Sequence, residues 1–137
     1  MTAKQSVVVG VDGSACSKAA IDWAVEYAGE TGRPLVLVTA WQWPMSYGIP
    51  ISYDGYNPEE DALKLVEATA ADVQLPEGMV TLEVSQGSPG DVLVAASAAA
   101  GLLVVGSRGH GSLAGALLGS TSNYCVHHAH CPVLVVR

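Results

Sequence analysis

The sequence lacks several features that mark common classes of protein. Only 14% of its 137 residues are charged and 50% are hydrophobic, which is not the composition of a disordered chain. The longest nearly apolar run, residues 92–106, is too short to cross a bilayer, and Ser97 and Gly101 interrupt it. Residues 1–10 hold no basic segment followed by an apolar one, so we expect no signal peptide. These absences favour one soluble domain over residues 1–137.

Acidic residues are also absent from the last third of the chain. The net charge is -7, which argues against nucleic acid as the main partner. All thirteen acidic residues lie in residues 1–91, and only Arg108 and Arg137 are charged beyond them. An anion can therefore approach this third without meeting an acidic residue nearby in the sequence. A buried sheet would also explain the low charge, but not an arginine inside a glycine-rich segment.

Disulfide spacing is missing as well, because the three cysteines are an odd number in no paired pattern. This cysteine usage is typical of a protein in the reducing cytoplasm.

Short apolar runs alternate with segments of helical periodicity. Helix starts are marked by Asn57-Pro58 and Ser88-Pro89, and Gly32 with Pro34 marks a helix end. The predicted strands cover residues 6–12, 34–41, 80–84, 102–106 and 133–136, and the predicted helices cover 13–32, 59–74, 88–100 and 120–129, with a loop over 42–57. This order predicts a doubly wound α/β fold, with a five-stranded parallel sheet covered by helices on both faces.

The glycine-rich segment at residues 104–123 can be compared with three phosphate-binding patterns. A Walker A loop needs a Gly-Lys pair, and the chain has none. Residues 109–114 match G-x-G-x-x-G/A, but the acidic residue expected about 20 residues later is missing, so we regard this match as chance. The third pattern is Gly106-x2-Gly109-x9-Gly119-Ser120.

On this third pattern the sequence resembles the ATP-binding subgroup of the universal stress protein family. The similarity extends over nearly the whole chain and includes VVVGVDGS, GSPGDVLVAAS, LLVVGSRGHG and LLGSTSNYCVHHAHCPVLVV. The resemblance implies a Rossmann-like fold of the adenine nucleotide alpha hydrolase type. It also implies a nucleotide-dependent stress sensor or regulator, and a homodimer that pairs through Val133–Val136. ATP, with or without Mg²⁺, is the implied ligand, and AMP or cyclic AMP stays open.

Elementary chemistry supports a phosphate site in this segment. Gly106 and Gly109 can adopt backbone angles closed to other residues and let phosphate oxygens approach the backbone amides. The helix predicted to start at Gly119 directs its first N–H groups and its positive dipole end at a bound anion. Arg108 can offset phosphate charge. The alternative is that the glycines only shape a turn and Ser120 only caps a helix.

The remaining site residues follow the first two strands, because ligands of open α/β sheets bind beyond the carboxyl ends of the strands. The resemblance places Asp12 at the nucleoside and the backbone of Ala40 at the adenine, although Asp12 also fits a turn at a helix start. At two positions the sequence differs from the family's usual pattern. Gly101 replaces an acidic residue before the fourth strand, and Thr39 replaces a histidine near the end of the second strand, so the exact nucleotide stays open. The expected nucleotide-binding residues are Gly10, Val11, Asp12, Ala40, Gly106, Ser107, Arg108, Gly109, His110, Gly119, Ser120, Thr121 and Ser122.

Two other clusters invite functional interpretations. The segment CVHHAHC, residues 125–131, is rich in metal-ligating residues, but its spacing fits no zinc template. The aromatic residues within 41–57 fit a lid over a base, a surface for partner proteins, or a loop packed on its own rings. Trp23 and Tyr27 share a helix face with two alanines, so we expect them in the core.

No catalytic residue is predicted, since Asp12 and His110 are the only titratable groups that we can place near the phosphates. Carboxylates for a Mg²⁺ site of the protein's own are not evident in the sequence. We therefore expect at most slow ATP hydrolysis. The alternative hypothesis is a nucleotide-free dimeric module that binds partner proteins through the aromatic loop 41–57.

Overall fold

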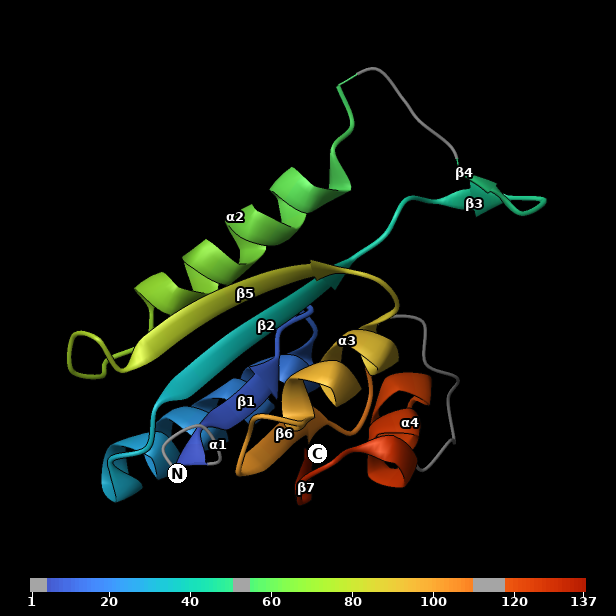
Figure 1. Cartoon of the computed structure of the whole chain (residues 1–137). Helices are drawn as coiled ribbons and strands as arrows, with labels where there is room; N and C mark the ends of the chain where they lie inside the picture. The colour runs from blue at the N-terminus through green and yellow to red at the C-terminus, as the bar shows by residue number, and fades with distance from the viewer. Residues whose placement is uncertain (1–4, 51–54, 110–117) are drawn as a thin grey trace.

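The computed structural model describes residues 5–50, 55–109 and 118–137 (Figure 1). The elements are β1 (Val7–Gly10), α1 (Ala15–Thr31), β2 (Leu35–Trp41), β3 (Met45–Ser46), β4 (Ile49–Pro50), α2 (Pro58–Ala71), β5 (Val80–Gln86), α3 (Pro89–Ser97), β6 (Leu102–Gly106), α4 (Ser120–His128) and β7 (Val133–Val136). The five predicted strands and four predicted helices are all present, which confirms the α/β prediction.

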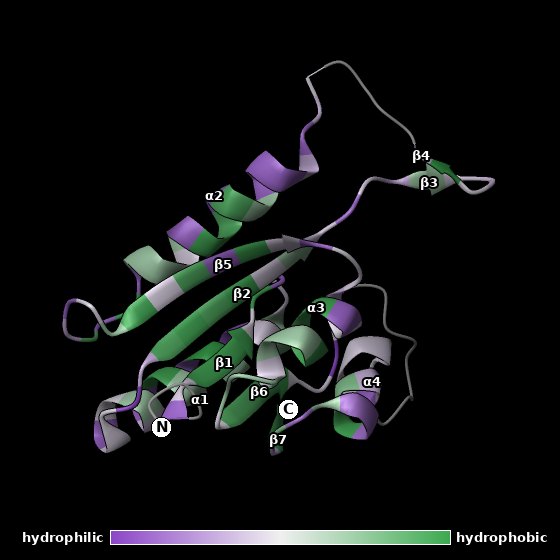
Figure 2. Ribbon diagram, in the orientation of Figure 1, coloured by the Kyte–Doolittle hydropathy of each residue, from purple (hydrophilic) through white to green (hydrophobic). Residues whose placement is uncertain are grey.

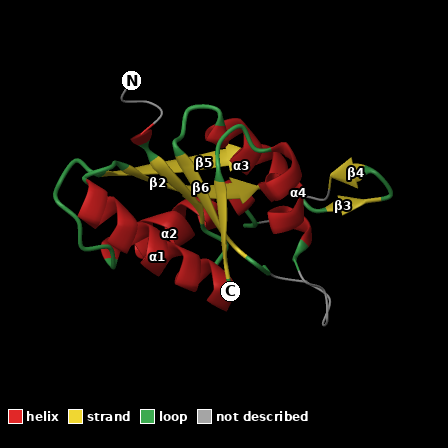
Figure 3. Ribbon diagram, turned by 90° about the horizontal axis from the view of Figure 1, so that it is seen from below, coloured by secondary structure: helices red, strands yellow, loops and turns green. Residues whose placement is uncertain are grey.

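The main sheet is parallel throughout and has the strand order β5-β2-β1-β6-β7. Helices α1 and α2 cover one face, and α3 and α4 cover the other (Figure 3). The chain leaves β1 in one direction and later returns to its other side with β6. The strand order therefore reverses beside β1, and this is where doubly wound sheets open a crevice for ligands.

The central strands are apolar because both of their faces are buried (Figure 2). Val7 and Val9 of β1 pack under α1 and α2, while Val8 points to the opposite face, under α3 and α4. The helices match this division, since Ala20 and Ala24 of α1 are fully buried against the first face. The two apolar layers fix the sheet between the helices and set the position of its carboxyl edge.

The loop prediction for residues 42–57 was incomplete, because β3 and β4 form a small antiparallel hairpin there. Its turn is Tyr47-Gly48, and both residues have positive φ angles, 51° and 77°. Two consecutive positive φ angles are what a tight hairpin turn requires. Strands of two residues are too short to show the alternation that identifies a strand in sequence.

The prediction for Trp23 was wrong, because its side chain is 38% exposed rather than in the core. It stacks on Tyr27, with ring centroids 5.2 Å apart, and Tyr27 itself is half-buried against the core. The small Ala20 and Ala24 bring α1 close to the sheet, so the larger rings lie at the side of the helix.

Helices α3 and α4 are joined through a buried glycine and a carboxylate. The Tyr124 hydroxyl donates to Asp91 Oδ1 at 2.8 Å, and the Ser88 hydroxyl donates to Asp91 Oδ2 at 2.9 Å. Gly90 permits this approach, since a Cβ there would lie 2.7 Å from the Tyr124 ring. The hydrogen bond from Tyr124, followed by that from Ser88, lowers the pKa of Asp91. The hydrogen bond to Asp91 raises the pKa of Tyr124.

This contact predicts a pH dependence. We expect the Asp91 carboxyl to titrate below its ordinary value of 3.8 in the folded protein, because the charged form accepts both hydrogen bonds. Its stabilising contribution is therefore complete above the unfolded-state pKa and is lost as pH falls through the lower folded-state pKa. The measurement is a carboxyl-carbon NMR titration of wild type and Tyr124→Phe, in which the variant raises the pKa of Asp91. Tyr27→Phe is the matched control and leaves it unchanged; an unchanged pKa in Tyr124→Phe would contradict the assignment.

Candidate functional site

A cavity of about 440 Å³ opens at the carboxyl ends of β1, β2 and β6, beside the reversal of strand order. This volume lies within the range of small-molecule sites, roughly 300–1,000 Å³. Eleven of the thirteen predicted residues line it, namely Gly10, Val11, Asp12, Ala40, Gly106, Arg108, Gly109, Gly119, Ser120, Thr121 and Ser122. Ser107 is buried beside the cavity, and His110 lies outside the described residues.

Gly106 at the end of β6 and Gly109 three residues later both lie in close packing. Neither Gly106 nor Gly109 has a positive φ, so the expected special backbone angles are not used. A Cβ on Gly106 would lie 2.7 Å from the carbonyl carbon of Cys16, in the first turn of α1. A Cβ on Gly109 would lie 2.6 Å from Asp12 Oδ2. The glycines thus bring the β6 end against α1 and bring the loop backbone beside a predicted site carboxylate.

Ser107 joins β6 to the start of α4. Its carbonyl oxygen accepts from the Gly119 amide at 2.6 Å and from the Ser122 hydroxyl at 2.9 Å. Its own amide donates to the Val136 carbonyl of β7 at 2.7 Å. Ser122 lines the cavity, but its hydroxyl hydrogen is directed to Ser107 and to the Gly119 carbonyl. That hydroxyl therefore attaches the first turn of α4 to the residue after β6, and its hydrogen is not directed at the cavity.

The N-terminus of α4 differs from those of the other helices. Side chains of Ser14, Asn57 and Ser88 cap α1, α2 and α3, whereas α4 begins after Gly119 with no side-chain capping bond. No acidic residue occupies its first turn, and Ser120 lines the cavity. Helix N–H groups without intrahelical partners and the positive end of the helix dipole therefore lie at the cavity.

The carboxylate of Asp12 is held at the turn between β1 and α1. Asp12 Oδ1 accepts from the Ser14 amide at 2.8 Å, which fits the turn role that the sequence left open. The Asp12 amide donates to Ser17 Oγ at 3.2 Å, and that hydroxyl donates to the Gly10 carbonyl at 3.1 Å. Asp12 also lines the cavity, so the turn fixes a carboxylate that faces the site.

The backbone of Ala40 is directed at the cavity by the strand pattern. Val38 accepts from the Val11 amide on the β1 side, whereas Trp41 accepts from the Gly87 amide on the opposite, β5 side. Successive residues alternate between the two neighbours of a strand, so the N–H and C=O of Ala40 point to the β1 side. Paired residues of β1 end at Gly10, opposite Val38, and Ala40 therefore presents a donor and an acceptor beyond the end of β1.

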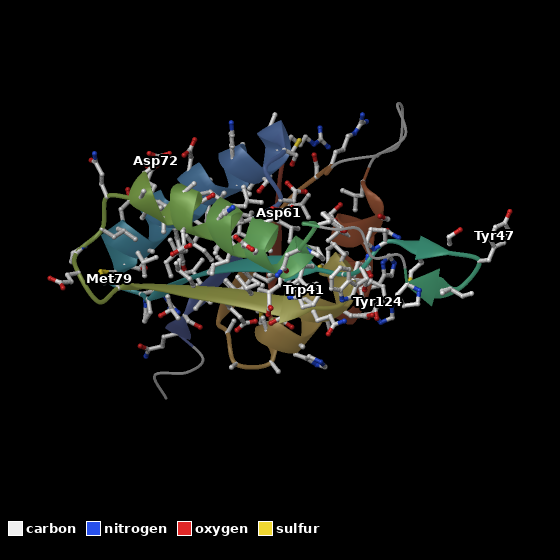
Figure 4. All side chains as sticks on the ribbon, turned by 90° about the horizontal axis from the view of Figure 1, so that it is seen from above. Trp41, Tyr47, Asp61, Asp72, Met79 and Tyr124 are labelled. Carbon is white, nitrogen blue, oxygen red and sulfur yellow. The ribbon has the colours of Figure 1, made fainter. Side chains whose placement is uncertain are left out.

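A further wall of the cavity comes from the aromatic loop, for which a lid over a base was one of the predicted roles, and from α2, which sequence reasoning missed. Trp41, Tyr56 and Asp61 line it, together with Pro58 and Leu65. Figure 4 shows Trp41 and Asp61 near the same end of the sheet, whereas Asp72 and Met79 lie at the opposite end. The last third of the chain has no acidic residue, but the cavity that it lines still contains a carboxylate, because the fold brings Asp61 of α2 to it.

The aromatic loop divides into two parts. Trp43 makes edge-on ring contacts with Trp41 at 6.1 Å and with Tyr56 at 6.2 Å, so these rings pack on one another beside the cavity. The hairpin tip points away from the sheet (Figures 1 and 4). Tyr47 is fully exposed there, and Met45 and Ile49 are mostly exposed.

The histidine- and cysteine-rich segment lies in the second half of α4 and the turn after it, and its three histidines are exposed. His128 lies 4.4 Å from the Tyr124 ring, His127 Nδ1 lies 2.8 Å from the Asn123 carbonyl, and Cys125 is buried. Burial raises the pKa of the Cys125 thiol to about 11. Within residues 5–50, 55–109 and 118–137, no three metal-ligating side chains gather into a potential metal site. None of the helices in these ranges is long and apolar enough to cross a membrane.

Comparison with known proteins identifies relatives over almost all of the chain. A family model described as the universal stress protein family matches residues 4–137. A universal stress protein of Mycobacterium tuberculosis is 39% identical over 132 residues, which cover 96% of this chain and 45% of that protein. The chain spans about half the length of the curated relatives that it matches.

Solved structures agree with the fold. A universal stress protein in complex with cAMP is 30% identical, with a TM-score of 0.69 and 98% of both chains covered. The universal stress protein UspA from Lactobacillus plantarum is 23% identical, with a TM-score of 0.74 and 97% of both chains covered. This second likeness concerns the fold alone.

The packing at Gly106 predicts a stability defect. We expect Gly106→Ala to lower the free energy of unfolding by about 1–3 kcal/mol, because the new Cβ meets backbone atoms of Cys16 that no side-chain rotation can move. Urea denaturation followed by circular dichroism measures this. Gly29→Ala is the matched control, because its Cβ would meet only the flexible end of Leu75 at 3.3 Å. Equal stability of the two variants would refute the account of Gly106.

Proposed function

The chain belongs to the universal stress protein family, and we propose that it binds an adenine nucleotide in the cavity beyond β1, β2 and β6. In this proposal it is an ATP-binding member that acts as a nucleotide-dependent sensor or regulator in the stress response. The observation that carries the proposal is the convergence of the predicted residues from β1, β2, the β6 end and the α4 start on one cavity. A 30% identical relative whose structure is in complex with cAMP supports an adenine nucleotide as the ligand.

The phosphate groups bind at the α4 end of the cavity. Arg108 supplies positive charge, and the uncapped start of α4 supplies N–H groups and the favourable end of a helix dipole. Ser120 adds an exposed hydroxyl. These groups favour a ligand with several phosphate charges, and hence ATP, with or without Mg²⁺, over AMP or cyclic AMP.

The adenine binds beside the backbone of Ala40. The N–H and C=O of Ala40 point to the same side of β2, so they match the acceptor and donor on one edge of adenine. Asp12 lies between this position and the loop containing Gly109, where it meets the nucleoside.

The site holds a nucleotide and hydrolyses it slowly at most. Among the described residues, Asp12 and Asp61 are the carboxylates that line the cavity. Asp12 already accepts from the Ser14 amide, and Asp61 is at the α2 end, away from the proposed phosphate site. Efficient hydrolysis needs a base directed at the water that attacks the phosphate.

The proposed assembly is a homodimer that pairs through β7 in the cytoplasm. β7 is an edge strand, and the carbonyls of Pro132 and Val136 accept hydrogen bonds on the β6 side. Alternation then directs the backbone groups of Val133 and Val135 outward, where a second copy can pair with them. The three cysteines are all free, which supports a reducing compartment.

The phosphate site is tested by calorimetry with ATP, AMP, cyclic AMP and adenosine. We expect Ser120→Ala to weaken ATP roughly threefold to tenfold and Arg108→Gln about tenfold or more, because hydrogen bonds to charged groups are lost. Neither variant should change adenosine binding. Arg137→Gln is the matched control and should bind ATP as wild type does. The absence of binding by any adenine ligand to wild type would overturn the proposed function.

The dimer is tested by analytical ultracentrifugation. We expect wild type to sediment as a dimer and Val135→Pro as a monomer, because proline removes an outward N–H without removing a hydrogen bond to β6. Val135→Ala keeps the N–H and controls for the loss of the valine side chain. A dimeric Val135→Pro would exclude pairing through β7.

A further inference from the structure

The α2 end of the cavity is lined by aromatic residues from separate segments. Trp41 is the last residue of β2, and Tyr56 lies two residues before α2, yet both line the same cavity. Trp43 does not line the cavity but contacts both rings edge-on, with interplanar angles of 84° and 80°. The third ring therefore braces the two cavity-lining rings, so that they are held in place before a ligand arrives.

The two ends of the cavity differ in charge. The first turn of α2 carries Glu59, Glu60 and Asp61, and the last of these lines the cavity. These carboxylates satisfy the positive end of the α2 dipole, and they disfavour a phosphate at that end. Arg108 and the uncapped α4 lie at the other end, where the first turn holds no acidic residue. A nucleotide is therefore oriented with its phosphates toward α4 and its base toward the rings.

We infer that Trp41 and Tyr56 form an aromatic wall that binds the base by stacking, and that this wall selects purine over pyrimidine nucleosides. The inference rests on the proposed function, because it concerns the base of the ligand whose phosphates bind at α4. A purine presents a larger π surface than a pyrimidine, so the same rings gain more contact with it. The aromatic wall binds the base independently of the phosphates.

The experiment measures the binding of adenosine, ATP and cytidine by calorimetry to ring-deleting and ring-keeping variants. Trp41→Leu and Tyr56→Leu should each weaken adenosine and ATP by the same factor, about tenfold, which is the size expected for losing a base-stacking ring. Trp41→Phe and Tyr56→Phe keep a ring and should retain most of the affinity. Wild type should prefer adenosine to cytidine, and the preference should shrink in the Leu variants.

Tryptophan fluorescence gives a second measurement that needs no Leu variant. In a Trp23→Phe background the remaining tryptophans are Trp41 and Trp43, and adenosine should quench their emission more than cytidine at equal saturation. Trp23 stacks on Tyr27 of α1 and does not line the cavity, so Trp23→Phe alone should bind adenosine as wild type does.

The outcomes separate this inference from the proposed function. Two results would contradict the aromatic wall and leave the phosphate site in place, provided that wild type binds ATP. One is that the Leu variants bind adenosine as wild type does, and the other is that adenosine does not change the tryptophan emission. If wild type binds neither ATP nor adenosine, both proposals fall. A loss of ATP affinity without a loss of adenosine affinity in Trp41→Leu would also contradict base stacking.

Discussion

The candidate site depends on the hydrogen bonds at the Ser107 carbonyl. This one oxygen accepts from the Gly119 amide and the Ser122 hydroxyl, and so it attaches the first turn of α4 to the end of β6. Ser107 is itself attached to β7 through its amide. This junction holds the N-terminus of α4 at the carboxyl edge of the sheet, while the hydrogen bond from Tyr124 to Asp91 attaches the same helix to α3. No side chain caps α4, so among the described residues no capping side chain competes with a ligand for the N–H groups of its first turn.

Much of the fold could be predicted from the sequence. The β6 and β7 runs are apolar on both faces, and Asn57-Pro58 and Ser88-Pro89 mark helix starts directly. These signals are local and strong. The β3–β4 hairpin could not be recognised, because each strand has only two residues and its turn lacks the usual Asn-Gly or Asp-Gly pair. Trp23 was misplaced because helical periodicity indicates a face and not how closely that face approaches the sheet.

The site was predicted only in part, because local sequence patterns do not show how distant segments pack together. Residues at the strand ends could be brought together from the sequence, because parallel strands share a carboxyl edge. The aromatic loop that includes Tyr56 could be suggested as a cover for a base, because it follows the second strand. The position of Asp61 depends on how α2 crosses the sheet, and no local pattern contains that information. The role of Gly106 also needed the structure. Its missing Cβ accommodates the backbone of Cys16, a contact between segments 90 residues apart in the chain.

The central claim is that one cavity holds a nucleotide with its phosphates at α4 and its base at the end of β2. The most direct test is an amide NMR titration of the isotope-labelled protein, first with adenosine and then with ATP. The account predicts that Ala40 and Trp41 shift with both ligands, whereas Gly109, Ser120 and Thr121 shift much more with ATP. Equal shifts of the loop and α4 amides with both ligands, or shifts confined to the opposite end of the sheet near Asp72 and Met79, would contradict it.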